Sequence, residues 1–261
     1  MNKKEILHGG RNGKIHKLGE KVIRPSNKWT QDVHDFLRFI HAEGADFVPY
    51  PYGITEDNKE VLSFLPGEVF HYPLPKQALT DDMLISAAKL LWNFHQYSRS
   101  YVSRLTNKEQ WMLPIMSPVE VLCHGDFAPY NVTIEDHKAT SIIDFDTLHP
   151  GSEMWDISYA IYRWVPFTLV NSSDEFVDVY DQIRRTKLFM DTYEVTNIKR
   201  KAFVAILTSR LKELIDFMVS EANNGNDDFK LNIENGHLEI YLNDIAYLQS
   251  NESLISKGIQ L

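Results

Sequence analysis

The sequence predicts an α+β protein with two lobes, in which a small antiparallel sheet comes first and a larger, mainly helical part follows. Short apolar or β-branched stretches between turn residues fill the first 65 of the 261 residues, whereas apolar residues at helical spacing dominate the remainder. Pro66 and Gly67 separate the two patterns, and the chain has neither an internal repeat nor a low-complexity linker. We therefore expect a hinge there, between an N-terminal lobe of residues 1–66 and a C-terminal lobe of residues 67–261.

The first lobe is predicted to hold five strands and one helix. The strands cover residues 6–7, 15–18 and 22–23 and the two stretches that flank the turn at residues 56–59, with residues 61–65 as the last strand. Pro25 ends the third strand. Thr30 is the expected N-cap of the helix, because the apolar residues within 33–40 follow the i, i+3, i+4, i+7 rule.

The second lobe is predicted to be mostly helical. Thr80 is the expected cap of a long helix, because the following Asp81 and Asp82 favour the positive end of a helix. A strand and a hairpin then interrupt the helices. They cover residues 119–123 and the pair 132–134 with 140–143, and further helices are expected near residues 174–194, 198–221 and 227–249.

Composition excludes several classes of function. The chain has 27 Lys and Arg against 36 Asp and Glu, a formal net charge of −9, which disfavours binding to nucleic acid. No apolar run approaches the ~18 residues that a membrane span needs. The N-terminus lacks the apolar stretch of a signal peptide, and a single cysteine, Cys123, suits the reducing cytoplasm. The spacing of the histidines does not suggest a zinc site. We expect a cytoplasmic protein without membrane contact.

The segment that carries chemistry begins at His124-Gly125-Asp126. Asn131 follows Asp126 by five residues and Asp144 follows it by eighteen, with the predicted hairpin between them. A strand that delivers a loop and a hairpin that folds back would bring Asp144 close to Asn131. Two oxygen ligands beside a third carboxylate can hold Mg²⁺ on a polyphosphate while the free carboxylate faces an incoming hydroxyl group.

Chance is a poor explanation of this spacing. With 10 His, 19 Asp and 16 Asn in the chain, the His-x-Asp-x4-Asn pattern is expected about 0.04 times, and the added Asp lowers this to about 0.003. The competing interpretation is that Asp126 and Asn131 only cap turns around Pro129 while Asp144 ends a strand.

The segment resembles the catalytic core of the aminoglycoside phosphotransferase and choline kinase group, relatives of the eukaryotic protein kinases. In that group His-Gly-Asp-x-x-x-x-Asn is followed by Ile-Asp-Phe/Trp-Asp/Glu. Other matching segments fall in the family's order over about residues 5–165, namely 9–10, 22–25, 62–68, 90–95 and 155–159. The resemblance implies a two-lobed, protein-kinase-like fold and a kinase acting on a small molecule.

The resemblance also implies roles for single residues. Asp126 corresponds to the catalytic base, and Asn131 and Asp144 correspond to the Mg²⁺ ligands. Gly9, Gly10 and Gly13 correspond to the nucleotide-covering loop, although a hairpin turn that needs glycine is the commoner explanation of such a pattern. The backbone of Ser63, Phe64 and Leu65 corresponds to the part that binds adenine.

Arg24 departs from the family pattern. It stands on the third strand, where many kinases carry a phosphate-pairing lysine, and the next helix offers only Asp32, Asp35 and Glu43 rather than an obvious glutamate partner. A strand-edge surface charge is the competing interpretation of Arg24. This departure leaves the geometry of the nucleotide open.

Several neighbouring residues are interpreted as structural. His95 and His124 are expected to be core histidines, Asp156 to hydrogen-bond the backbone of the catalytic loop, and Cys123 to be a buried, inert thiol. Acidic and aromatic rows could attract a cationic acceptor, although a solvated face and an aromatic core explain them as well. These rows are Asp174, Asp178 and Asp181 together with Trp155, Tyr159, Tyr162 and Trp164.

The predicted function is transfer of the γ-phosphoryl group of ATP or GTP, with Mg²⁺, to a hydroxyl group of a small molecule such as an aminoglycoside or an amino alcohol. The alternative is a nucleotide-binding protein without turnover, of the pseudokinase or bacteriocin-immunity type. The residues leave the acceptor, the choice between ATP and GTP, and the oligomeric state open.

Overall fold

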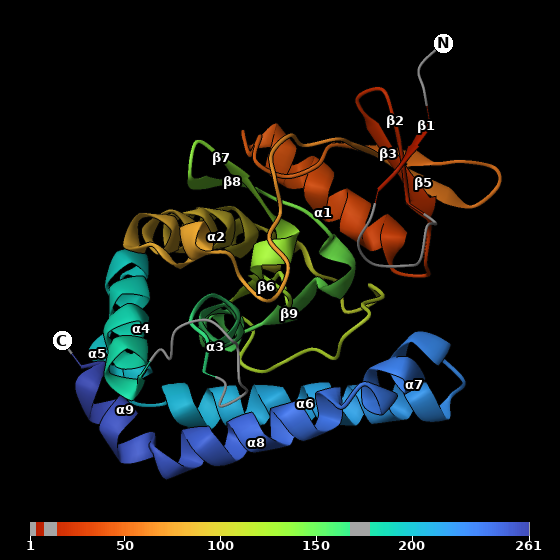
Figure 1. Cartoon of the computed structure of the whole chain (residues 1–261). Helices are drawn as coiled ribbons and strands as arrows, with labels where there is room; N and C mark the ends of the chain where they lie inside the picture. Colours follow the sequence, from red (N-terminus) through yellow and green to blue (C-terminus); the bar gives the residue numbers. More distant parts are fainter. Residues whose placement is uncertain (1–3, 8–14, 168–177, 261) are drawn as a thin grey trace.

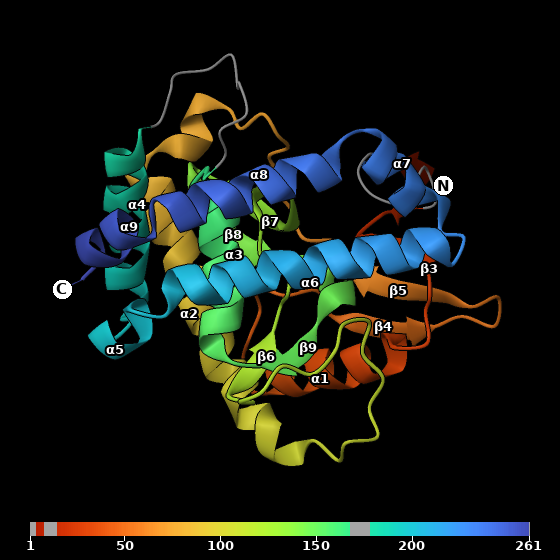
Figure 2. The ribbon, with the colours of Figure 1, turned by 90° about the horizontal axis from the view of Figure 1, so that it is seen from below.

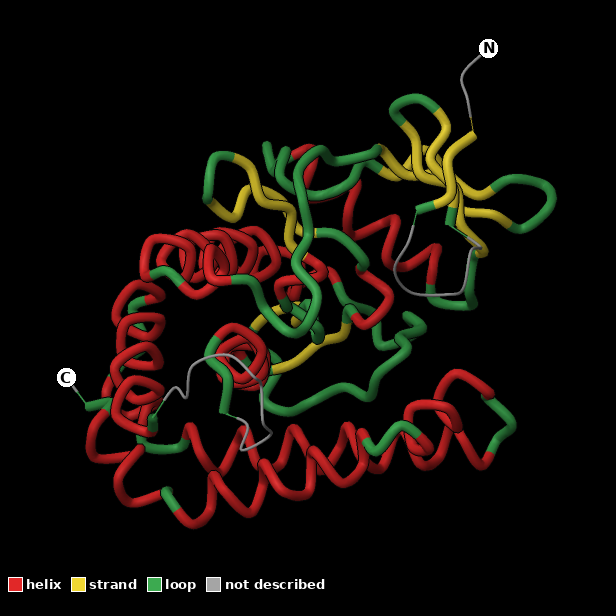
Figure 3. Tube along the Cα trace, in the orientation of Figure 1, coloured by secondary structure: helices red, strands yellow, loops and turns green. Residues whose placement is uncertain are grey.

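A computed structural model describes residues 4–7, 15–167 and 178–260 of the chain. Figure 1 shows a small sheet with one helix packed beside it, and a larger assembly of helices that surrounds two short strand pairs. The tube in Figure 3 shows the same division between strands and helices. The α+β class, with an antiparallel N-terminal sheet and a mainly helical C-terminal part, is therefore confirmed.

The N-terminal sheet has five antiparallel strands in the order β1-β2-β3-β5-β4. Their bounds are β1 (Lys4–Ile6), β2 (His16–Leu18), β3 (Lys21–Pro25), β4 (Pro51–Ile54) and β5 (Lys59–Ser63). β3 lies in the middle of this order, so Arg24 stands on a central strand, and its residue is only 5% exposed. The interpretation of Arg24 as a strand-edge surface charge is wrong.

Helix α1 (Thr30–Ala42) connects β3 with β4 and packs its apolar side, including Phe36 and Ile40, into the core. The predicted N-cap at Thr30 is wrong by one residue, because Trp29 occupies the cap position. The Thr30 hydroxyl instead accepts a hydrogen bond from the backbone N–H of Asn27 at 2.8 Å, which closes the turn before the helix.

Helix α2 (Asp81–Tyr101) begins where the sequence predicts, since the Thr80 hydroxyl accepts a hydrogen bond from the N–H of Met83 at 3.3 Å. Strands β6 (Val121–Cys123) and β9 (His149–Gly151) pair, and so do β7 (Val132–Glu135) and β8 (Lys138–Ile142). The predicted strand and hairpin are thus confirmed. Figure 1 shows the β7–β8 hairpin above α2 and the β6–β9 pair close to α3.

The connection after Pro66 and Gly67 is fastened to the hairpin. The N–H of Glu68 donates to the carbonyl of Ile134 at 3.0 Å, and the N–H of Ile134 donates to the carbonyl of Glu68 at 2.7 Å. A Cβ on Gly67 would lie 2.9 Å from the carbonyl oxygen of Ile134, so only glycine allows this close approach. The predicted hinge therefore passes directly against the strand that follows the catalytic loop.

The remaining helices are α3 (Glu153–Trp164), α4 (Val179–Tyr193), α5 (Asn197–Arg200), α6 (Phe203–Asn223), α7 (Asp227–Glu234), α8 (His237–Ser250) and α9 (Glu252–Gly258). α6 and α8 run side by side, as Figures 1 and 2 both show. Within the described ranges, no helix is both long enough and apolar enough to cross a membrane.

Two of the predicted helices are wrong in their extent. The stretch 198–221 contains a break at residues 201–202, which separates α5 from α6, and the stretch 227–249 is interrupted at Asn235 and Gly236. Gly236 takes a left-handed conformation with φ of 83°, which ends one helix before the next begins. The helix predicted from residue 174 starts at Val179, and residues 174–177 lie outside the described part.

Candidate active site

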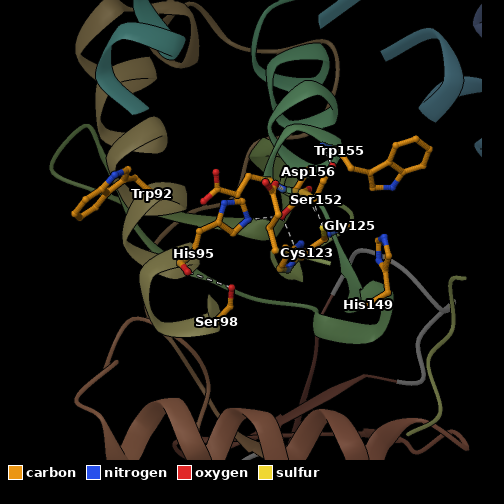
Figure 4. A network of polar contacts seen from close by, with 12 residues as sticks. Trp92, His95, Ser98, Cys123, Gly125, His149, Ser152, Trp155 and Asp156 are labelled. Carbon is orange, nitrogen blue, oxygen red and sulfur yellow. Dashed lines mark hydrogen bonds and ion pairs between the residues drawn. The ribbon is translucent and has the colours of Figure 1, made fainter. Parts of the chain in front are cut away.

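Asp156 of α3 holds the backbone of the loop that follows β6. Its Oδ2 accepts from the N–H of His124 at 2.7 Å and its Oδ1 accepts from the N–H of Gly125 at 2.9 Å. His95 of α2 contacts the same carboxylate through Nε2 at 3.0 Å, and Figure 4 shows Asp156 between His95 and Gly125. Burial alone would raise the pKa of Asp156, but the hydrogen bonds and nearby histidines lower it to about 2.

The two histidines and the cysteine of this region have structural surroundings, as expected. His95 and His124 are completely buried. His124 accepts from the N–H of Asp126 through Nδ1 at 3.3 Å, so its Nε2 is the nitrogen that donates to the carbonyl of Ile143, at 3.0 Å. Burial raises the pKa of the Cys123 thiol well above its usual value, which makes it unreactive.

Asp126 is held by two residues that follow it on the same loop. Its Oδ2 accepts from Nδ2 of Asn131 at 2.9 Å and its Oδ1 accepts from the hydroxyl of Tyr130 at 2.7 Å. Burial raises the pKa of Asp126, although the charge of Arg163 and the hydrogen bond from Tyr130 act in the opposite direction. A raised pKa makes the carboxylate a better proton acceptor than an exposed aspartate.

The hairpin returns Asp144 to the same place. The N–H of Ile143 donates to the backbone carbonyl of Asn131 at 2.9 Å, which brings the residue before Asp144 against the loop. Asp144 has a left-handed backbone with φ of 61°, and its side chain is 44% exposed. Its negative charge contributes to the raised pKa of Asp126. Asp126, Asn131 and Asp144 are therefore brought together, as the spacing in the sequence predicts.

Arg24 reaches this cluster from the N-terminal sheet. Its Nη1 lies 2.5 Å from Oδ1 of Asp144, its Nη2 lies 3.4 Å from Asp146, and its Nε lies 2.5 Å from Oε1 of Glu60. The three carboxylates raise the pKa of Arg24 despite the opposing effect of burial. The following helix supplies no glutamate to Arg24, as the sequence indicates, and the glutamate partner comes from strand β5 instead.

The structure describes only some of the other residues that were predicted to contact the nucleotide. Gly9, Gly10 and Gly13 lie outside the described residues. The N–H of Ser63 donates to the carbonyl of Tyr50 and that of Phe64 to the carbonyl of Glu20, both at 2.9 Å. The amide of Leu65 has no acceptor among the described residues, so it is the donor that this segment can offer to a ligand.

A cavity of about 470 Å³ is lined by Asp126, whereas Asn131 and Asp144 are not part of its lining. Its wall combines the loop that carries Asp126 with the segment 112–116 and with residues of α3, α6, α7 and α8. Its lining includes Tyr130, Trp155, Tyr159, Arg210, Glu213 and Tyr241. Of the predicted aromatic row, Trp155 and Tyr159 thus line a cavity, whereas Tyr162 and Trp164 belong to the core. This volume suits a small molecule.

The predicted acidic row does not line this cavity. Asp178 caps α4 by accepting from the N–H of Asp181 at 2.9 Å, Asp181 contacts Arg184 at 2.8 Å, and Asp174 lies outside the described residues. Sequence reasoning missed Arg210, Glu213 and Tyr241, because helical periodicity shows which face of a helix is apolar but does not show which polar residues border a cavity.

Comparisons with known proteins agree with this geometry. Residues 104–189 match the family model described as the phosphotransferase enzyme family. No curated protein sequence matches the chain. A choline/ethanolamine kinase family protein from Mesorhizobium loti is similar in structure with a TM-score of 0.65 at 14% identity, covering 98% of this chain and 92% of that one.

Two further solved structures are similar. An amicoumacin kinase in complex with AMP-PNP, Ca²⁺ and amicoumacin has a TM-score of 0.64 at 12% identity, covering 89% of this chain and 88% of that one. An ADP-bound aminoglycoside phosphotransferase has a TM-score of 0.54 at 13% identity, covering 100% and 95%. The resemblance drawn from the sequence is thereby confirmed: the fold is protein-kinase-like, and residues 104–189 match the phosphotransferase enzyme family.

Proposed function

We propose that this protein transfers the γ-phosphoryl group of ATP to a hydroxyl group of a small molecule and that the transfer depends on Mg²⁺. The observation that carries the proposal is the position of Asp126. Its carboxylate is bonded to Asn131 within the polar cluster, and the same residue lines the cavity. Phosphoryl transfer needs the donor and the acceptor on two sides of one positioning group, and Asp126 fits that place.

In the proposed step, Asp126 orients the acceptor hydroxyl and takes its proton. A bond forms between the hydroxyl oxygen and the γ-phosphorus while the bond from that phosphorus to the β–γ bridging oxygen breaks, and ADP leaves. Tyr130 and Asn131 fix the orientation of the carboxylate. The raised pKa of Asp126 favours acceptance of the proton.

Asn131 and Asp144 suit Mg²⁺ by their chemistry. The amide nitrogen of Asn131 donates to Asp126, so the amide oxygen is the atom left for a cation, and Asp144 offers a half-exposed carboxylate. When bound, the ion would neutralise phosphate charge. No group of three or more His, Cys, Asp or Glu residues in the described ranges could hold a metal. Mg²⁺ commonly binds one or two carboxylates together with substrate phosphates.

Arg24 is the proposed phosphate-binding residue of the N-terminal lobe (residues 1–66), and the backbone near Leu65 is the proposed adenine site. Arginine can donate two parallel hydrogen bonds to a phosphate. The neighbouring structures solved with AMP-PNP and with ADP support a nucleotide site in this fold. The acceptor then binds to the C-terminal lobe (residues 67–261).

The test is ADP release with a panel of hydroxyl compounds, together with nucleotide binding measured by thermal shift with and without Mg²⁺. We expect Asp126→Ala to lower kcat by about 10²–10⁴-fold with nucleotide binding retained. Asp144→Ala should weaken the Mg²⁺-dependent part of nucleotide binding. Glu135→Gln, on an exposed residue of the same hairpin, is the matched control and should change neither quantity.

A nucleotide-binding protein without turnover is the second candidate. The ion pair between Arg24 and Asp144 favours it, because the guanidinium takes one carboxylate oxygen that a metal ion would use. For this candidate, ATP would stabilise the protein equally with and without Mg²⁺, and Asp126→Ala would leave every measured rate unchanged.

A further inference from the structure

Arg210 of α6 is a buried cation without a carboxylate partner. Among the described residues, Arg24, Arg185, Arg200 and Arg210 are the buried arginines. Arg24 contacts three carboxylates, Arg185 contacts Asp81 at 3.5 Å, and Arg200 contacts Asp191 at 2.7 Å. For Arg210, 5% exposed, no described carboxylate lies within 4.0 Å. A buried charge without a counterion is costly to a folded protein, so this position calls for a ligand.

The guanidinium of Arg210 is held rigidly at the wall of the cavity. Its Nη2 donates to the carbonyl of Gly125 at 2.8 Å, next to Asp126 in the chain. The group lies 4.3 Å from the ring centroid of Tyr159 and 5.7 Å from that of Trp155, and its Nε has no hydrogen-bond partner among the described residues. Because the group is already positioned, little conformational entropy is lost when an anion binds.

The other charges near the cavity are arranged unevenly. Arg163 lies 4.5 Å from the ring centroid of Tyr72 and 5.2 Å from that of Tyr130, again with no described carboxylate in ion-pair contact, and its charge acts on Asp126. Glu213 and Asp216 also line the cavity, but both are exposed. Two arginines, Arg163 and Arg210, therefore lie near the single carboxylate of Asp126, which leaves an excess of positive charge there, and the exposed acidic side chains lie at the open side of the cavity.

We propose that the acceptor carries, in addition to the hydroxyl group that faces Asp126, an anionic group, either a carboxylate or a phosphate, which binds the guanidinium of Arg210. The proposal rests on the proposed function and specifies its substrate class. It replaces the cationic acceptor suggested by the acidic row in the sequence, because Asp178 and Asp181 of that row do not line the cavity. The exposed Glu213 and Asp216 disfavour a second anionic group and leave room for an ammonium group at the open side.

The experiment compares acceptors that differ only in the anionic group. The pairs are ethanolamine with L-serine, and glycerol with D-glycerate and with glycerol 3-phosphate, and a broader set of hydroxy acids and phosphate monoesters follows. Binding is measured without nucleotide by thermal shift and titration calorimetry, and turnover is measured by ADP release. We expect the anionic members to bind and their uncharged or cationic counterparts not to bind. The comparison of D-glycerate with glycerol 3-phosphate shows whether the site prefers a carboxylate or a phosphate.

Variants identify the residue that binds the anion. Arg210→Met should raise the Kd of anionic acceptors about 10- to 100-fold, and Arg210→Lys should restore part of the affinity. The loss of affinity should follow the charge of the acceptor, whereas a merely structural role of Arg210 in holding Gly125 would not discriminate between acceptor charges. Arg184→Met, on a half-exposed surface arginine, is the matched control and should bind like the wild type.

Three results of the binding measurements would each overturn the inference: no anionic compound binds, the uncharged or cationic counterparts bind equally well, or Arg210→Met binds anions like the wild type. Asp126-dependent phosphorylation of amino alcohols alone would also overturn it while leaving the proposed kinase intact. Anion binding that needs Arg210, without any turnover of ATP, would support the anion site and count against the kinase.

Discussion

Arg24 and Glu60 face each other across the paired strands β3 and β5, with Nε of the arginine 2.5 Å from Oε1 of the glutamate. His34 of α1 contacts the other oxygen of Glu60 at 3.0 Å, and Arg24 reaches onward to Asp144. The sheet, the helix beside it and the loop after β8 therefore meet at one buried guanidinium. Glu60 holds Arg24 within the sheet, and the contact of Arg24 with Asp144 connects the N-terminal sheet to the loop after β8.

Replacing Glu60 by alanine is the first prediction. It leaves the buried guanidinium of Arg24 without its partner from the sheet, and removal of one member of a buried pair costs about 3–5 kcal/mol. We expect the lower end of that range, because Asp144 and Asp146 still neutralise Arg24. Urea denaturation measures the free energy of unfolding. The KM for ATP should also rise, because Arg24 is no longer held in position by Glu60.

Glu56→Gln is the matched control for this prediction, because Glu56 is an exposed acid in the turn that precedes β5. It should leave the denaturation midpoint unchanged. If Glu60→Ala is as stable as this control, Glu60 does not hold Arg24 in the protein.

The sequence predicts the local elements of this site well and the long-range contacts less well. The spacing of Asp126, Asn131 and Asp144 predicts their meeting, because a hairpin lies between them and its geometry is short-range. Glu60 could not be assigned to Arg24 in the same way, since the pairing of β3 with β5 skips over α1 and β4. The turn residues and alternation within a strand indicate a strand without showing which other strand lies beside it.

Arg210 shows the same limit for helices. It lies 85 residues after Gly125, whose carbonyl it contacts. Its helix is recognisable from the apolar spacing, but nothing in that spacing shows that this arginine is buried and borders a cavity. The break at Gly236 was missed as well, although glycine after asparagine is a common helix end.

The second prediction concerns Asp156 and pH. Its pKa of about 2 in the folded protein lies below the usual value of 3.8, so its ionised form contributes stability above about pH 4, and this contribution is lost as the pH falls towards 2. The difference amounts to about 2 kcal/mol. The gap in unfolding free energy between the wild type and Asp156→Asn should therefore shrink by that amount between pH 5 and pH 2. A gap that stays constant between pH 5 and pH 2 would show that folding does not lower the pKa of Asp156.

The third prediction uses Tyr130 to shift the pH profile of the reaction. The Tyr130 hydroxyl donates to the ionised carboxyl of Asp126 and lowers its pKa, so Tyr130→Phe should raise that pKa further. Because the proposed base must be ionised, activity is lost as the pH falls through this pKa, and the acidic limb of kcat/KM should move to higher pH. Tyr180→Phe, on an exposed tyrosine of α4, should leave the limb in place. A limb that moves to lower pH would contradict the assignment of Asp126 as the base.

The last prediction concerns Gly125, which has a φ of 82° and stands where a Cβ would lie 2.5 Å from the carbonyl oxygen of Thr147. Gly225 offers a matched control, since its φ of 94° is also left-handed but nothing lies within 4 Å of the added Cβ. Both alanine variants carry the backbone strain, and only Gly125→Ala carries the clash, which should cost about 1–3 kcal/mol more in urea denaturation. The clash also pushes the loop away from Thr147 and moves Asp126, so kcat should fall in Gly125→Ala while Gly225→Ala keeps the wild-type rate. Equal stability of the two variants would mean that the loop relaxes freely, and Asp126 would then owe its position to Tyr130 and Asn131 alone.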